Sequence, residues 1–152
     1  GRTTLEDMLK FRVLIDFAHN EAGYRGLTDF ALALPAERRI ATVSLPGDRR
    51  EEDFEHCSKI ISEGFDQIVI FESYLRGRKP GEILELYRKY LIETGMDESA
   101  ITMIPDEKDA VKFALDSAQE NDLVVLSNYD IDETHAQVMQ YKNRMESEYN
   151  RS

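Results

Sequence analysis

The stretch VLIDFAHNEAGY, residues 13–24, decides how the rest of the sequence is interpreted. It opens as a run of Val, Leu and Ile, which is typical of a strand buried on both faces. It then turns polar at Asp16, His19 and Asn20, and a helical stripe follows at Leu27, Phe30, Ala31 and Leu34. Ligands bind at the carboxyl ends of the strands in open α/β sheets. Two interpretations stay open: the polar residues form a ligand site, or Asp16 or Asn20 caps the helix while His19 is solvated.

Buried runs and amphipathic segments alternate along the whole chain. We expect strands at about 11–17, 39–45, 66–72, 101–104 and 123–126, and helices at about 22–34, 52–62, from Pro80, from Asp106 and at 132–145. Such alternation indicates a parallel sheet covered on both faces. We therefore predict a Rossmann-like doubly wound, three-layer α/β domain. Its mostly parallel sheet would have five to six strands, with helices on both faces.

The sequence divides into one domain with two short ends. We expect residues 1–10 to be a linker or an edge strand, residues 11–146 to form the α/β domain, and residues 147–152 to be a frayed polar tail. The lead-in before residue 11 is short. We therefore expect the chain to be a piece of something longer, with another domain before it.

The composition excludes several classes of function. A net charge of −11 argues against a nucleic-acid binder, because phosphate contacts need clustered Lys and Arg. No apolar run approaches the ~20 residues that a membrane span needs. The single cysteine, Cys57, lies in step with buried-type residues of its helix and cannot form an internal disulfide, so we expect a packed thiol and a cytoplasmic protein. The sequence has no cluster of cysteine and histidine residues that would predict a metal site.

The loops after the first three predicted strands share one edge of a parallel sheet. They carry polar side chains in three groups: Asp16, His19 and Asn20; Asp48, Arg49 and Arg50; and Glu72, Arg76 and Arg78. Local basic clusters in an acidic chain favour a small anionic ligand, and arginine presents a planar fork to carboxylate or phosphate. Taken alone, the second group follows an ordinary turn and the third is a basic loop before a helix. The convergence of the three groups at one edge of the sheet favours a ligand site.

Residues 16–24 (DFAHNEAGY) resemble the D-[YF]-[AG]-H-N-P-x-[GS] signature of the Mur ligase superfamily C-terminal domain, although Glu21 stands where that family usually has proline. Residues 47–50 (GDRR) and 76–82 (RGRKPGE) resemble stretches of the cyanophycin synthetase branch. Residues 121–125 (NDLVV) are similar to that family's G-D-L-V-V ending, with asparagine for glycine. The chain is thus identified as a member of this superfamily, whose domains also have an antiparallel edge strand.

The resemblance implies one domain of an ATP-dependent ligase, which joins an amino acid to a carboxylate through an acyl phosphate. It implies that Asp16 binds the ATP ribose and that Arg2 lies beside the nucleotide. His19 and Asn20 would lie near the phosphates or the reacting centre as catalytic residues. The domain's implied share is to complete the nucleotide site and to position the incoming amino acid, which is an orientation role.

On the substrate side, the resemblance implies that Arg49, Arg76 and Arg78 bind substrate carboxylates and that Asp48 is a further substrate-binding residue. The amino acid would be aspartate or arginine if the chain is cyanophycin-like. The implied cofactor is ATP with Mg²⁺, with phosphates and metal held mainly by a central domain, because the sequence contains no G-x-x-x-x-G-K-[ST] motif. The remaining domains of the same polypeptide would be its partners, and an oligomer is compatible with the sequence.

A standalone nucleotide- or amino-acid-binding α/β module without catalysis is the alternative. It fits a compact domain, but not the abrupt beginning of the chain. A phosphoacceptor receiver domain needs an aspartate after the third strand and a lysine after the fifth. Because Glu72 and Ser127-Asn128 stand at those places, we set that class aside.

Overall fold

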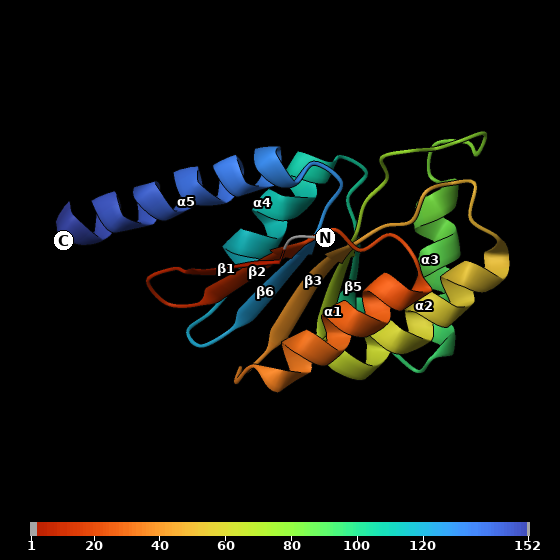
Figure 1. Cartoon of the computed structure of the whole chain (residues 1–152), viewed down its shortest axis with the longest axis horizontal. Coiled ribbons are helices and arrows are strands. Elements are labelled where there is room, and N and C mark those ends of the chain that lie inside the picture. The colour runs from red at the N-terminus through yellow and green to blue at the C-terminus, as the bar shows by residue number, and fades with distance from the viewer. Residues whose placement is uncertain (1–2, 152) are drawn as a thin grey trace.

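Strands and helices alternate along the chain as the sequence predicts. The computed structural model describes residues 3–151, which form an open six-stranded sheet between two helical layers (Figure 1). The strands are β1 (Thr4–Asp7), β2 (Arg12–Asp16), β3 (Arg39–Val43), β4 (Gln67–Ile70), β5 (Ile101–Met103) and β6 (Leu123–Ser127). The helices are α1 (Glu21–Ala33), α2 (Glu51–Gly64), α3 (Glu82–Glu93), α4 (Glu107–Ser117) and α5 (Ile131–Arg151). The predicted α/β class is confirmed.

The order of the strands in the sheet differs from their order in the chain. It is β1-β2-β6-β3-β4-β5, so the last strand lies between β2 and β3. β1 pairs with β2 in antiparallel orientation, and the other neighbouring strands are parallel. Residues 4–7 are therefore an edge strand rather than a linker.

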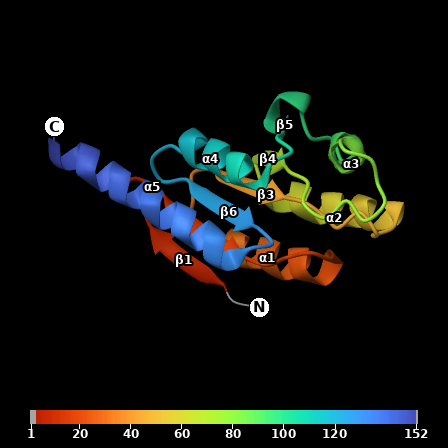
Figure 2. The same ribbon diagram turned by 90° about the horizontal axis from the view of Figure 1, so that it is seen from above.

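Alternating side chains of the strands pack into two cores, one on each face of the sheet. Leu14 packs with residues of α1, α2 and α3, whereas its neighbours Val13 and Ile15 pack with residues of α4 and α5. Figure 2 shows α4 on the opposite side of the sheet from α1 and α2. Fully buried strands of this kind read as continuous apolar runs, which is why the sequence located them. Cys57 is buried in the first core, as expected.

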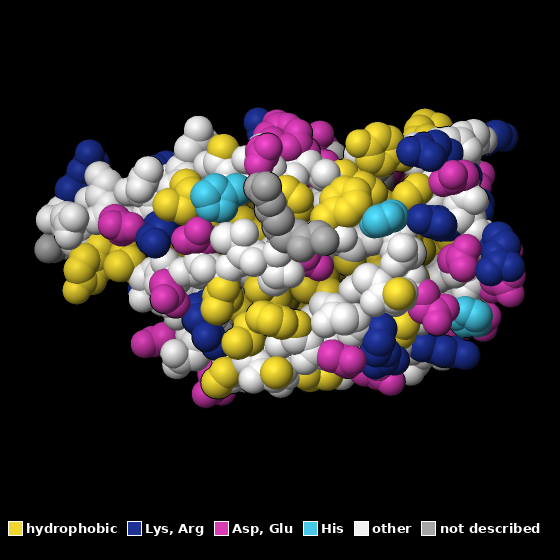
Figure 3. Space-filling model, in the orientation of Figure 1, with side chains coloured by type: hydrophobic (Ala, Val, Ile, Leu, Met, Phe, Trp, Pro, Cys, Tyr) yellow, Lys and Arg dark blue, Asp and Glu magenta, His cyan; other side chains and the backbone are white. Residues whose placement is uncertain are grey.

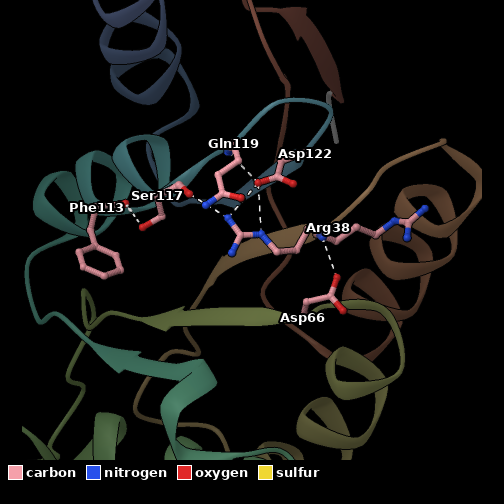
Figure 4. A network of polar contacts seen from close by, with 7 residues as sticks. Arg38, Asp66, Phe113, Ser117, Gln119 and Asp122 are labelled. Atoms are coloured by element: carbon pink, nitrogen blue, oxygen red, sulfur yellow. Dashed lines mark hydrogen bonds and ion pairs between the residues drawn. The ribbon is translucent and has the colours of Figure 1, made fainter.

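A buried acid fixes the amino-terminal edge of the sheet (Figure 4). Asp122 is 3% exposed, and its Oδ2 accepts hydrogen bonds from Arg38 Nη2 (3.0 Å) and from the backbone N–H of Gln119 (2.8 Å). Arg38 also donates to the Ser117 carbonyl, 2.9 Å away, which ties the start of β3 to the end of α4. Asn121 has a φ of 68°, so asparagine takes the turn conformation expected where the family has glycine.

Two helix boundaries differ from the prediction. α3 begins at Glu82 rather than Pro80, because Gly81 has a φ of 91° and its N–H donates to the Glu72 carboxylate, 3.0 Å away. The last helix was expected to end near Met145, but α5 runs to Arg151 and residues 147–151 are helical. It contains no glycine or proline that would end it. Figure 1 shows its last turns extending past the sheet.

We expect Asp122→Ala to destabilise the protein by about 3 kcal/mol, because it leaves the Arg38 guanidinium without its buried partner. Urea denaturation measures this loss. Asp66→Ala is the matched control, since Asp66 is exposed and accepts one bond, from the Arg39 N–H (2.8 Å). Equal losses in the two variants would contradict the role of the buried acid.

Candidate functional site

A crevice is expected at the carboxyl end of β6. β2 and β3, which flank β6 in the sheet, lead into α1 and α2 on one face, whereas β6 leads into α5 on the other. Neighbouring strands with connections to opposite faces open a ligand crevice at their carboxyl ends. The predicted convergence of the loops after β2, β3 and β4 at one edge is confirmed. The loop after β6, residues 128–130, joins them and was missed.

Asp16 ends β2 beside a small groove. Its Oδ1 accepts a hydrogen bond from the Thr3 hydroxyl (2.9 Å), and it does not cap α1. The groove has a volume of about 320 Å³ and is lined mainly by apolar groups and glycine: Phe17, Ala22, Gly23, Gly26, Leu27 and Phe30. An acidic acceptor therefore borders an apolar surface. Arg2, the other predicted nucleotide residue, lies outside the described residues.

The capping interpretation is correct for Asn20. Its side chain accepts a hydrogen bond from the Gly23 N–H (2.8 Å), which satisfies a free donor at the start of α1. His19, in contrast, is not a fully solvated loop residue. Its ring packs against the Phe17 ring at 4.7 Å between centroids, and its Nδ1 is buried without a hydrogen-bond partner among residues 3–151. The histidine therefore presents an unsatisfied polar atom beside the crevice.

The loops after β3 and β4 are clamped together. The Gly47 N–H donates to the Tyr74 carbonyl (2.8 Å), and Arg78 Nε donates to the Gly47 carbonyl (2.7 Å). A Cβ atom at position 47 would lie 1.7 Å from the Leu75 carbonyl oxygen, so the close approach of the two loops requires glycine at this position. The glycine of the GDRR stretch therefore allows two loops to act as one unit.

Arg78 is engaged with the protein itself. Besides its bond to Gly47, its Nη2 donates to the Arg49 carbonyl (3.0 Å) and its Nη1 to Glu82 (2.6 Å). The guanidinium also lies over the Phe54 ring, 5.5 Å from its centroid. Of the two arginines in the RGR segment, this one holds the loop in place.

Arg76 is the exposed member of the pair. It adopts a φ of 48°, and its guanidinium lies 5.3 Å from the centroid of the Tyr74 ring. Its Nη1 forms an ion pair with Asp48 Oδ2 at 3.3 Å, with both side chains more than half exposed. The structure thus brings Asp48 and Arg76 together at the rim. Figure 3 shows basic side chains beside hydrophobic and histidine side chains in the upper right of that view, where these loops lie.

Buried polar atoms without hydrogen-bond partners gather at this edge. Within residues 3–151 they include Nδ1 of His19, Oγ of Ser44, Nε of Arg49, Nδ2 of Asn128 and the hydroxyl of Tyr129. Native proteins seldom leave such groups unpaired, and each one calls for an explanation. A ligand or water in the crevice would supply the missing partners. The polar residues that follow the buried run of β6 were the signal by which sequence reasoning could have found this loop.

A buried tyrosine joins the strand ends beneath the crevice. The Tyr24 hydroxyl donates to the Ser44 carbonyl (2.7 Å) and accepts from the Ser44 N–H (3.1 Å). Ser127 Oγ lies 3.3 Å from the same hydroxyl and donates to the Ala18 carbonyl (3.0 Å). Burial raises the pKa of Tyr24 above its ordinary value, so the hydroxyl stays neutral. The contacts connect α1, β3 and β6.

The residues described contain no helix long and apolar enough to cross a membrane. Within 3–151, no group of three or more His, Cys, Asp and Glu side chains is arranged to hold a metal ion. The groove of about 670 Å³ between residues 7–12, 35–37 and 121–122 lies at the opposite edge of the sheet from the predicted site residues.

Comparison with known proteins identifies the family. Residues 1–127 match the model of the "Mur ligase, glutamate ligase domain". The chain belongs to this family. A cyanophycin synthetase from Nostoc sp. (strain PCC 7120) is 37% identical over 127 residues, which are 83% of this chain and 14% of that protein. A cyanophycin synthetase from Synechocystis sp. (strain PCC 6803) is 36% identical with the same coverage. This glutamate ligase domain thus spans 14% of the length of those relatives.

Solved structures share the fold of this Mur ligase domain. A UDP-N-acetylmuramoyl-L-alanyl-D-glutamate--2,6-diaminopimelate ligase superposes with a TM-score of 0.74 at 18% identity, covering 93% of this chain and 32% of that one. E. coli FolC in complex with ADP has a TM-score of 0.62 at 20% identity, with coverages of 93% and 31%. The resemblance to the superfamily is confirmed, whereas the roles of the individual site residues stay predictions.

We expect Gly47→Ala to destabilise the protein by about 1–3 kcal/mol, because its methyl group would force the two clamped loops apart. Thermal unfolding of the chain measures the loss. Gly26→Ala is the control, since a Cβ there meets nothing within 4 Å and alanine favours the helix. A Gly47 variant as stable as the Gly26 variant would show that the loops separate freely.

Proposed function

We propose that this chain is the C-terminal domain of an ATP-dependent ligase resembling cyanophycin synthetase. It would complete the nucleotide site and position the incoming amino acid for amide formation. The observation that carries the proposal is the arrangement around β6: Asp16 ends the strand on one side of it, and the clamped arginine loops follow the strands on the other. One side offers an acceptor for sugar hydroxyls, and the other offers donors for carboxylates. The remaining groups would come from other domains of the polypeptide.

The groove beside Asp16 supports a nucleotide on that side. The carboxylate would accept from ribose hydroxyls as it now accepts from the Thr3 hydroxyl. Leu27 and Phe30 give the groove an apolar wall against which a base can lie. His19 and Asn20 stand at the amino end of α1, where the helix dipole and free N–H groups favour an anion such as a phosphate. We assign Arg2 a place beside the nucleotide from the family resemblance alone.

The clamped loops support a carboxylate on the other side. Arg49 has a buried Nε without a partner among residues 3–151, and a substrate carboxylate would satisfy it. Arg76 stands exposed at the rim, where Asp48 supplies a neighbouring acceptor. Arg78 would contribute by fixing the loop that carries Arg76, since its own donors already bind the protein. Aspartate or arginine is the proposed amino acid.

The chemistry assigned to the domain is orientation. In the proposed reaction the acceptor carboxylate becomes an acyl phosphate at the expense of ATP, and the amine of the amino acid displaces phosphate to form the amide. Holding the two reactants in line can lower a barrier by roughly 7–11 kcal/mol. ATP phosphates and Mg²⁺ are assigned mainly to a central domain. The cytoplasm is the proposed location, in keeping with the free thiol of Cys57.

In the full-length ligase, we expect Asp16→Ala to weaken ATP use while the melting temperature stays unchanged. Losing a charged acceptor for ribose costs about 1.5–3 kcal/mol, or roughly 10- to 150-fold in apparent affinity. Steady-state kinetics with ATP varied give the value. Asp130→Ala is the control, because Asp130 is another exposed acid at this edge and its Oδ1 caps α5 through the Glu133 N–H (3.0 Å). An unchanged KM for ATP would overturn the nucleotide assignment.

The double variant Arg49→Ala/Arg76→Ala should raise the KM for the amino acid by at least tenfold and spare the KM for ATP, since two charge-assisted donors are lost on the carboxylate side alone. Lysine at position 76 should restore only part of the affinity, because it lacks the planar fork. Lys79→Ala, an exposed cation of the same loop, should have no effect. The assay varies aspartate and arginine separately. If neither KM changes, these arginine loops do not bind the amino-acid substrate.

A further inference from the structure

An unbroken series of ring contacts crosses the crevice. Arg76 stacks on Tyr74, and the Tyr74 ring meets the Tyr129 ring edge to face at 4.9 Å between centroids. Tyr129 in turn meets Phe17 edge to face at 5.9 Å, and Phe17 packs on His19 at 4.7 Å. Edge-to-face pairs at such distances are attractive beyond the area that they bury. The series joins the arginine loop to the histidine loop.

Tyr129 is the central member of this series and is itself well anchored. It follows β6, the strand between the two halves of the proposed site. Its N–H donates to Glu107 Oε2 at the start of α4 (2.8 Å), and its ring also meets the buried Phe71 ring at 6.0 Å. Phe17 and Tyr74, in contrast, are 37% and 47% exposed. The two exposed outer rings therefore pack against a central Tyr129 ring that is held in place.

The ring of Tyr129, rather than its hydroxyl, makes these contacts. The hydroxyl is buried beside the Ser44 side chain and makes no hydrogen bond of good geometry within residues 3–151. Burial accordingly raises the pKa of Tyr129. A phenylalanine would keep every ring contact and remove an unsatisfied polar group. The structure thus separates the two parts of the side chain, and a pair of variants can test them separately.

The two sides of the crevice are also joined by contacts that do not involve the rings. The loops after β3 and β4 form one clamped unit through Gly47 and Arg78, and α1 reaches β3 through the Tyr24–Ser44 bonds near the strand ends. At the amino end of α1, Glu21 also contacts His56 of α2 (2.9 Å), whereas the contacts that link the His19 loop to the Arg76 loop run through the aromatic rings. The placement of the Arg76 loop relative to the His19 loop therefore depends on the Tyr129 ring.

We infer that Tyr129 is a positioning residue that holds the His19 loop and the Arg76 loop in register across the crevice. The inference rests on the proposed function, because register matters when a nucleotide-activated carboxylate on one side must meet an amine on the other. Each loop keeps its own binding groups without the ring. Losing the ring should therefore affect the rate of the aligned step much more than the binding of either substrate, since a misplacement of about 1 Å can cost roughly 100-fold.

The kinetic test uses the full-length ligase with Tyr129→Leu, which removes the ring, and Tyr129→Phe, which removes only the hydroxyl. We expect the leucine variant to lose about 10- to 100-fold in kcat while both KM values change less than about threefold. The phenylalanine variant should retain kcat within about twofold. Phe11→Leu is the matched control, because Phe11 is a buried aromatic of the same core at the opposite edge. It should lose stability without this kinetic signature when assayed well below its melting temperature.

A second measurement, on the 152-residue chain itself, is independent of ligase activity. Hydrogen exchange should accelerate together at residues 17–20 and 74–78 in Tyr129→Leu and stay unchanged in Tyr129→Phe. If Tyr129→Leu fails to fold, Phe17→Ala and Tyr74→Ala each break the series at an exposed ring and should show the same loss of kcat.

Two results would overturn the inference. A Tyr129→Phe variant whose kcat falls as far as that of Tyr129→Leu would show that the hydroxyl is responsible. Hydrogen exchange of residues 17–20 and 74–78 that stays the same in Tyr129→Leu would show that the ring does not hold the loops. A wild-type full-length protein without ATP-dependent amide formation would instead refute the proposed function, and the exchange result would still decide the positioning role.

Discussion

The insertion of β6 between β2 and β3 is the constraint on which the rest of the structure depends. Five pairs of residues in register align β6 with β2, and four align it with β3, so its carboxyl end emerges between theirs. Because β6 then leads to the other face of the sheet, its connection diverges from those of β2 and β3 at the strand ends. Asp16 and the arginine loops are separated by one strand as a result.

That separation explains why the unsatisfied polar atoms gather in one place. Asn128 shows the pattern: its Oδ1 accepts from the Thr42 hydroxyl (2.9 Å) and its N–H donates to the Asp16 carbonyl (3.1 Å), yet its Nδ2 has no partner in the described part of the chain. The residue is held by both neighbouring strands, which fixes the position of this donor. Such preorganised donors are what a binding site for anionic reactants needs.

The sequence was sufficient for features set by local chemistry. Apolar runs located the strands, Asn20 and Asp106 proved to be helix caps, and Asn121 took the predicted turn conformation. The sequence could not predict features that are set by tertiary contacts. Nothing local distinguishes Arg78, bound to two loop carbonyls, from exposed Arg76, and the position of β6 in the sheet, which makes Tyr129 central, is fixed only by the packing of all the strands.

The central claim is that this domain supplies one side of a nucleotide site at the end of β2. The most direct measurement is a structure of the full-length protein with a non-hydrolysable ATP analogue and Mg²⁺. The account predicts ribose hydroxyls about 2.5–3.0 Å from the Asp16 carboxylate, within hydrogen-bonding distance, and the base against the groove that contains Leu27 and Phe30. A nucleotide bound in the same protein without touching any residue of 16–30 would contradict it.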